Sequence, residues 1–382
     1  MTGFRALGPA LFGGLVLAGL LYWAGSTTHA LSLPGATNFL GPDQANRLKA
    51  WTTPWSTDVP SSPQFTSPAG ASGHGADYVA LRETAMRVRY AALILIFSGG
   101  AALLLRRLSG RTAMHAVART MALWGWGITA AMLAVTVSAP WAAASGGSAT
   151  HQLLPTLAST MSQGRDLPLV AALAAAAATT GLTALLSREP VSTPHPPTSI
   201  PTSTARLAAT LGTAVILFAL TVPSNQKVAA YIQTGFTGNG RLSEPGDLLR
   251  QWLQLSAWTT PTGPTLGRWL LYRLGEVVLV ATVWWALRLL PTLFDHVTVP
   301  AYALGAAAAT TLGAEANDMW HSLLTYQTVT GGPLLYYIST GSGASAALVF
   351  GSLAGCASTV AVRRHIRAQS PPPAEPQRRP VS

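Results

Sequence analysis

Eight long stretches of the chain are mostly apolar and nearly free of charged residues, and they constrain the fold more than any other feature. They cover residues 7–23, 90–105, 121–142, 167–186, 207–222, 269–290, 299–316 and 343–362. A helix needs about 20 such residues to cross the hydrocarbon core of a bilayer. Of the structures that span lipid, a helix is the one that satisfies its backbone polar groups within a single segment. The stretches therefore predict an all-α, polytopic membrane helical bundle with about eight transmembrane helices.

The composition favours the same class. Only 10% of the residues are charged and the mean hydropathy is +0.33, whereas soluble domains carry about a quarter charged residues. Arginine greatly outnumbers lysine, and Ala, Gly and Pro are abundant, which is typical of a GC-rich bacterial genome. The single cysteine, Cys356, excludes an intrachain disulfide. We therefore expect a multi-pass protein of the bacterial plasma membrane.

The placement of arginines predicts the orientation. With the N-terminus in the cytoplasm, the short loops on the inner side contain Arg106, Arg119, Arg206 and Arg288 close to helix ends. Positive charge in short loops beside helix ends marks the cytoplasmic side of a membrane protein. Both termini are therefore expected in the cytoplasm.

A repeated pentapeptide suggests an internal duplication. Ala-Trp-Thr-Thr-Pro occurs at residues 50–54 and again at 257–261. Tyr90 precedes Arg106 by sixteen residues, as Tyr272 precedes Arg288. These landmarks follow the same order in each half, so they predict two tandem four-helix repeats. Because each unit would hold an even number of spans, the two repeats would be parallel.

The expected units have boundaries set by composition. Residues 1–187 form the first four-helix unit and include a Ser-, Pro- and Gly-rich outer loop, 56–77, that is expected to be mobile. Residues 188–205 form a Pro/Ser/Thr-rich cytoplasmic linker, and residues 206–362 form the second unit. Residues 363–382 form a basic, Pro-rich cytoplasmic tail that is suited to anionic lipid headgroups rather than to nucleic acid.

Each copy of the pentapeptide follows a short helical pattern. Asp43 and Asp247 stand where helix N-caps are expected. The second pattern has an apolar stripe suited to the membrane interface, formed by Leu248, Leu249, Trp252 and Leu255.

The pentapeptides themselves are interpreted as interfacial elbows. Trp51 and Trp258 would anchor the chain at the membrane interface, where tryptophan is common. Pro54 and Pro261 would end the preceding helices. This structural role is favoured over ligand binding.

Acidic residues in the second unit form the candidate site for an ion, a proton or another ligand. Glu315, Asp318 and His321 are spaced by three residues, so neighbouring members lie near one another along a helix. Glu276 lies inside a predicted span, where ionisable residues are functional candidates. The alternative is structural: Glu315 and Asp318 cap a helix, and Glu276 pairs with Arg273. The nature of any metal stays open.

The two histidines that follow the third helix of each unit add a further alternative. His151 and His321 are each followed two residues later by a Leu-Leu pair. If the units pack about a common axis, both rings would face one outer cavity. The alternative, which we favour, is that both are exposed loop residues.

The sequence is therefore compatible with three classes of function. The first is a non-enzymatic subunit or scaffold of an envelope complex, with envelope proteins or further copies of the chain as partners besides the lipid bilayer. The second is a transporter or ion permease that uses the acidic site, and the third is an outer-face membrane enzyme. The sequence lacks the P-loop, zinc-protease, serine-hydrolase and c-type haem motifs. No cofactor and no nucleic-acid partner is expected.

Overall fold

The computed structural model describes residues 3–58, 75–108, 113–145, 153–162, 166–186, 201–236, 244–258, 266–293, 298–326 and 343–369. All named elements within these ranges are helices, which confirms the all-α prediction. The eight long helices are α1 (Gly3–Ser26), α5 (Gly75–Arg107), α6 (Ala113–Ser145), α8 (Asp166–Leu186), α9 (Thr202–Thr221), α12 (Leu266–Leu293), α13 (Val299–Tyr326) and α14 (Ala344–Gln369). Each contains most or all of one predicted span.

Seven of these helices are long and apolar enough to cross a membrane; α13 does not reach the same apolarity. The reason lies in its composition. α13 is rich in alanine, and it carries Thr310, Thr311, Glu315 and Asn317, which are all buried in the protein. The polar groups lower its mean hydropathy although the helix has 28 residues.

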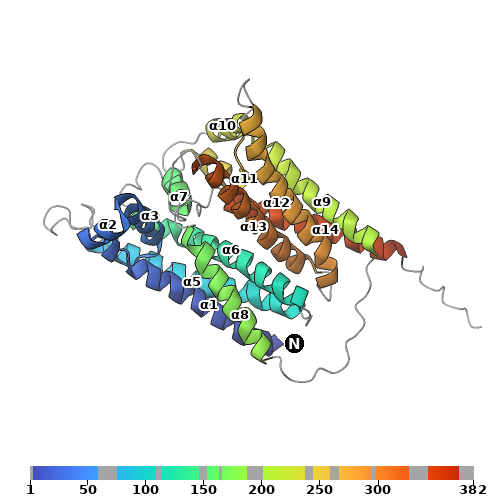
Figure 1. Cartoon of the computed structure of the whole chain (residues 1–382), viewed down its shortest axis with the longest axis horizontal. Helices are drawn as coiled ribbons and strands as arrows, with labels where there is room; N and C mark the ends of the chain where they lie inside the picture. Colours follow the sequence, from blue (N-terminus) through green and yellow to red (C-terminus); the bar gives the residue numbers. More distant parts are fainter. Residues whose placement is uncertain are drawn as a thin grey trace, which may run out of the picture.

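Shorter helices gather at one end of the bundle, towards the upper left of Figure 1. The N-terminus and the start of α9 lie at the opposite end. The shorter helices of seven residues or more are α2 (Pro34–Leu40), α3 (Pro42–Thr52), α7 (Leu153–Ser162), α10 (Gln226–Gly235) and α11 (Pro245–Leu253). Two single 3-10 turns, η1 (Ala30–Ser32) and η2 (Thr53–Trp55), flank the α2–α3 pair. The two ends of the bundle therefore differ in structure, and one of them carries the short helices.

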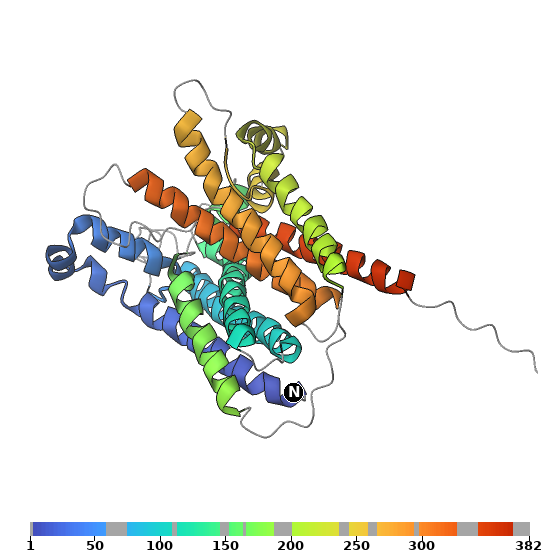
Figure 2. The same ribbon diagram turned by 45° about the vertical axis from the view of Figure 1, so that its right-hand side comes forward.

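The long helices of each half of the chain pack in a closed ring. In the first half, α1 packs on α5, α5 on α6, α6 on α8, and α8 on α1. In the second half, α9 packs on α12, α12 on α13, α13 on α14, and α14 on α9. The two rings lie side by side in both views and meet mainly along α6 and α13 (Figure 2).

Small residues allow α6 and α13 to approach closely. A Cβ atom added to Gly125 would overlap the carbonyl oxygen of Ala308. One turn further along, the Oγ1 atoms of Thr129 and Thr311 are 3.1 Å apart and share a buried hydrogen bond. Glycine and threonine at such a seam bring helices into the close packing that holds them together in lipid.

The two predicted N-caps are wrong. α3 begins at Pro42 with Gly41 as its N-cap, and α11 begins at Pro245 with Glu244 as its N-cap. Asp43 and Asp247 lie in the first turn instead. Proline favours the first helical position because its fixed φ suits the helix and its missing N–H needs no partner. An Asp in the first turn still interacts favourably with the helix dipole.

Parts of the expected organisation lie outside the described residues. These parts are 59–74 of the outer loop, 188–200 of the linker and 370–382 of the tail. The remainder of the linker contributes the first residues of α9, and the start of the tail continues α14 as far as Gln369.

We predict that Gly125→Ala destabilises the protein by about 1–3 kcal/mol, because the added methyl group overpacks the seam between α6 and α13. Gly99→Ala is the matched control, since Gly99 lies exposed in α5 with no atom within 4 Å of an added Cβ. The control is expected to be neutral or stabilising by up to about 1 kcal/mol. Thermal unfolding of the purified protein in detergent measures both variants. Equal effects of the two substitutions would contradict the close packing of α6 and α13 at Gly125.

Candidate functional site

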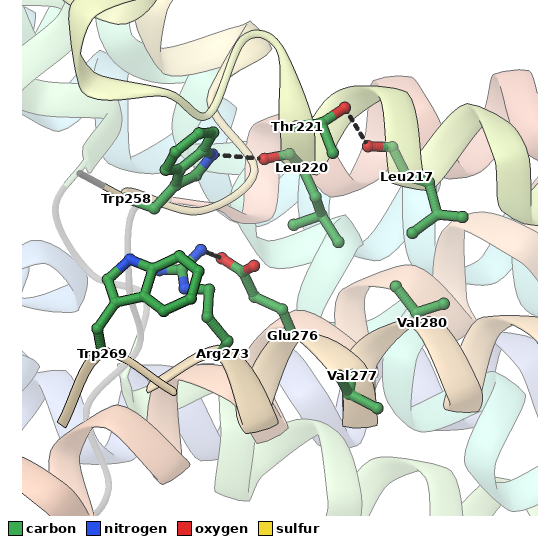
Figure 3. A pocket seen from close by; sticks show the side chains of 9 residues that line it. All are labelled: Leu217, Leu220, Thr221, Trp258, Trp269, Arg273, Glu276, Val277 and Val280. Atoms are coloured by element: carbon green, nitrogen blue, oxygen red, sulfur yellow. Dashed lines mark hydrogen bonds and ion pairs between the residues drawn. The ribbon is translucent and has the colours of Figure 1, made fainter. Parts of the chain in front are cut away.

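A cavity of about 350 Å³ lies between α9 and α12 near the end that carries the short helices (Figure 3). Its volume falls in the range of small-molecule sites, roughly 300–1,000 Å³. The walls are mainly apolar, with two indole rings and one pair of charged residues. The lining residues are Leu217, Leu220, Thr221, Trp258, Trp269, Arg273, Glu276, Val277 and Val280.

The charged pair of the cavity is well buried. The Nη1 of Arg273 donates to the Oε1 of Glu276, and the two side chains are 17% and 13% exposed. The Ser256 hydroxyl donates to the same oxygen at 2.8 Å. The guanidinium also lies over the ring of Trp269, 5.7 Å from its centroid. Glu276 therefore forms the ion pair that the structural interpretation of the sequence expects.

The second elbow closes the cavity from the side of the short helices. The Trp258 indole Nε1 donates to the carbonyl oxygen of Leu220 at 2.8 Å. The backbone N–H of Trp258 donates to Ser224, and its carbonyl accepts from Gln226. These bonds fasten the elbow to the end of α9, so the position of the Trp258 ring is fixed. α11 ends at Leu253, four residues before the repeated Ala-Trp-Thr-Thr-Pro begins at Ala257, and Pro261 lies outside the described residues.

The first elbow is held by buried bonds. α3 ends at Thr52, and Pro54 lies in the 3-10 turn η2 that follows it directly. Trp51 is only 8% exposed, so protein rather than lipid surrounds most of its ring. Tyr90 of α5 donates to the carbonyl of Trp55 at 2.7 Å, and Arg89 donates to the carbonyl of Pro54.

Arg89 makes buried structural contacts that the sequence analysis missed. Its side chain is 4% exposed, and its Nε also donates to the Ser138 hydroxyl of α6 at 2.8 Å. Trp55, fully buried, was missed as well. The signal for Arg89 was present, because a basic residue at the edge of an apolar run needs a partner. Ser256 gave no signal, since its partner is far away in sequence.

The residues predicted on α13 lie apart from the cavity lining. Glu315 is 4% exposed within the bundle, and Asp318 is half-buried. The Nε2 of His321 is 3.1 Å from the carbonyl oxygen of Tyr272 on α12, and its ring packs edge-on against the Tyr272 ring. His321 thus links α13 to α12.

The metal interpretation finds no support in the described part of the chain. No group of three or more His, Cys, Asp or Glu side chains is arranged there to hold a metal ion. His151, the partner expected for His321, lies outside the described residues.

No family model matches the chain, and no curated protein or solved structure is significantly similar to it.

We predict that Arg273→Met destabilises the protein by about 3 kcal/mol, because it leaves the Glu276 carboxylate buried without its cation. Glu276→Gln costs less, since an amide oxygen still accepts from Ser256. The double variant Arg273→Met/Glu276→Leu recovers most of the loss, because neither charge then stays buried alone. Thermal unfolding in detergent provides the measurement.

The matched control for this pair is Arg87→Met in α5. Arg87 pairs with Glu83 at 3.1 Å, but the two side chains are 81% and 56% exposed. Such pairs contribute little to stability, so the control is expected to unfold as the wild type does. A double variant no more stable than Arg273→Met alone would show that Arg273 and Glu276 do not act as a pair.

Proposed function

We propose that this chain is a multi-pass protein of the bacterial plasma membrane that serves as a non-enzymatic subunit or scaffold of an envelope complex. The main support is that the buried polar side chains bind one another or the backbone of neighbouring segments. Arg89 binds a backbone carbonyl and Ser138. Arg273 and Glu276 bind each other, and the ring of His321 lies on α12. Groups that hold helices together in this way are not poised for turnover.

The cluster of short helices supports a binding role on the outer side. Phe39 of α2 is 89% exposed and Tyr231 of α10 is 74% exposed. α10 packs on α11, and α11 packs in turn on α7 and α14, so part of this surface rests on the long helices. Exposed aromatic residues on a supported surface are typical of protein interfaces.

We further propose that α13 is the eighth span. Its 28 residues reach about 42 Å as an α-helix, more than the ~30 Å of the hydrocarbon core. Its buried polar residues face protein rather than lipid, and such residues are tolerated in a span on the inside of a bundle.

The proposal of two tandem parallel repeats draws support from matching contacts. Each half has the same ring order of long helices. In each half, the second long helix supplies an arginine to the elbow: Arg89 to the carbonyl of Pro54, and Arg273 to that of Ala257 at 3.4 Å.

The proposed orientation, with both termini cytoplasmic, draws support from the charges. Every carboxylate with a described side chain lies in the half of the bundle nearer the short helices: Asp43, Asp58, Asp77, Glu83, Glu244, Asp247, Glu276, Glu315 and Asp318. The opposite end carries only cations among its described charged side chains: Arg106, Arg107, Arg119, Arg206, Arg288, Arg363 and Arg364. A purely cationic end fits the cytoplasmic face.

A permease is the second candidate, and one observation favours it. Glu315 and Asn317 are 4% and 1% exposed inside α13, the helix at the centre of the contact between the halves. Ionisable residues buried in a span often mark ion or proton paths. The enzyme hypothesis receives no comparable support from the described residues.

We predict that single cysteines at positions 203 and 364 react with a membrane-impermeant reagent only from the cytoplasm, and one at position 38 only from outside. Ser203, Arg364 and Asn38 are all exposed, and Cys356 is replaced by Ala in the background. If α13 does not span, positions 203 and 364 react from opposite sides. If all three positions react from the reverse sides, the orientation is wrong.

We predict that a C-terminally tagged chain, purified in mild detergent, recovers other envelope proteins in stoichiometric amounts. Phe39→Asp and Tyr231→Asp are expected to reduce that recovery several-fold, because they place charge on the exposed aromatic surface. Asn38→Asp, also exposed in α2, is the matched control. Quantitative mass spectrometry makes the comparison. A self-associated species alone, with ion flux in vesicles that Glu315→Gln abolishes, would replace the scaffold with the permease.

A further inference from the structure

We propose that the cavity between α9 and α12 binds one membrane phospholipid with a zwitterionic, amine-bearing headgroup, of the phosphatidylethanolamine type. The cavity holds a charged pair at one level and apolar walls along the remainder of its length. The cavity matches such a lipid in the sign of its charges, in its depth in the bilayer and in its opening towards the surrounding lipid.

The depth of the charged pair suits a headgroup. α12 has 28 residues and reaches about 42 Å, so it extends beyond the ~30 Å hydrocarbon core. Arg273 lies seven residues from the helix start at Leu266, about 10 Å along the axis. The pair therefore sits near the boundary between headgroups and hydrocarbon. Val277 and Val280 lie deeper on the same helix, where an acyl chain would run.

The charged pair can serve both charges of a zwitterion. Glu276 Oε1 accepts from Arg273 and Ser256, while Oε2 accepts no hydrogen bond among the described residues. Arg273 Nη2 makes only a 3.4 Å contact with Ala257, so this nitrogen of the guanidinium keeps donor capacity. A lipid ammonium would bind Glu276, and the phosphate would bind Arg273. Because the pair is neutral as a whole, a net anionic headgroup gains less.

The indole of Trp258 adds selectivity for the amine. Its Nε1 is already bonded to Leu220, which fixes the ring at the level of the charged pair. A tryptophan ring attracts a nearby cation through its π electrons. An alkylammonium beside Glu276 would therefore find both a carboxylate and an aromatic ring.

The walls are open to lipid. Leu217 of α9 and Val277 of α12 line the cavity and are 46% and 59% exposed. An acyl chain can therefore enter sideways from the bilayer without any opening of the bundle. This inference does not depend on the proposed scaffold role, since a permease could hold the same lipid.

The test uses the full chain reconstituted in nanodiscs that contain phosphatidylethanolamine and phosphatidylglycerol in equal amounts. Native mass spectrometry after gentle release identifies the retained lipid. The wild type is expected to retain one phosphatidylethanolamine per chain. Val277→Trp fills the cavity mouth and is expected to reduce retention roughly tenfold. Val278→Trp, at the neighbouring exposed position outside the lining, is the matched control and should retain the lipid.

Glu276→Gln tests the headgroup. It removes the negative charge but keeps an acceptor for Ser256, so the preference for phosphatidylethanolamine over phosphatidylglycerol is expected to fall roughly tenfold. Equal retention of both lipids by the wild type would overturn the proposal, as would equal retention by the Val277→Trp and Val278→Trp variants. The tryptophan pair stays decisive even if Glu276→Gln does not purify, because both sites lie on the exposed face of α12.

Discussion

Close backbone approach between helices is the constraint on which this bundle depends. Helices in hydrocarbon gain nothing by covering apolar surface, so van der Waals packing and side-chain bonds must hold them together. Gly125 against Ala308 and Gly355 against Tyr302 provide such approaches around α13. The same rule explains the cavity. On α9, Gly212 lets Leu287 of α12 come close near the cationic end, whereas Leu217 and Leu220 face α12 further along. The cavity lies beside these two leucines.

A second set of contacts joins the elbows to the bundle. Backbone carbonyls at the end of a short helix need donors where water is scarce. Arg89 provides such a donor to the first elbow and Arg273 to the second. The two sites differ in what surrounds the cation. Arg89 is enclosed, with the ring of Trp55 at 5.8 Å from its guanidinium carbon, and Ser138 beside it. Arg273 has a carboxylate partner and lines an open cavity. Of the two elbows, as far as their surroundings are described, the second therefore has more space beside its arginine.

Features that depend on composition could be predicted from the sequence. Each of the eight apolar stretches falls almost entirely within one long helix, and seven of these helices are long and apolar enough to cross a membrane. α13 shows the limit, since its buried Thr310 and Glu315 lower its hydropathy without moving it out of the bundle. The N-caps were wrong because the proline before Asp43, and the Pro-Gly before Asp247, set the helix starts instead.

The candidate site was predicted only in part, because tertiary partners are invisible in sequence. The Arg273–Glu276 pair was visible, since the two residues are one turn apart. The bond from Ser256 to Glu276 joins α12 to the elbow, and the bond from Trp258 to Leu220 joins the elbow to α9. Neither spacing follows a helical period. The cavity exists only because these three segments meet, and no local pattern carries that information.

Because the short helices lie at one end only, the two ends of the molecule would bind a partner in different ways. The end with the short helices has an irregular surface with exposed aromatic rings and charges of both signs, and such a surface can discriminate between protein partners. The other end, as far as its side chains are described, has helix tips whose charged side chains are all arginine. A surface of that kind attracts any anion at close range and selects weakly among them. Under the proposed scaffold role, recognition by shape and retention by charge would therefore act on opposite sides of the bilayer.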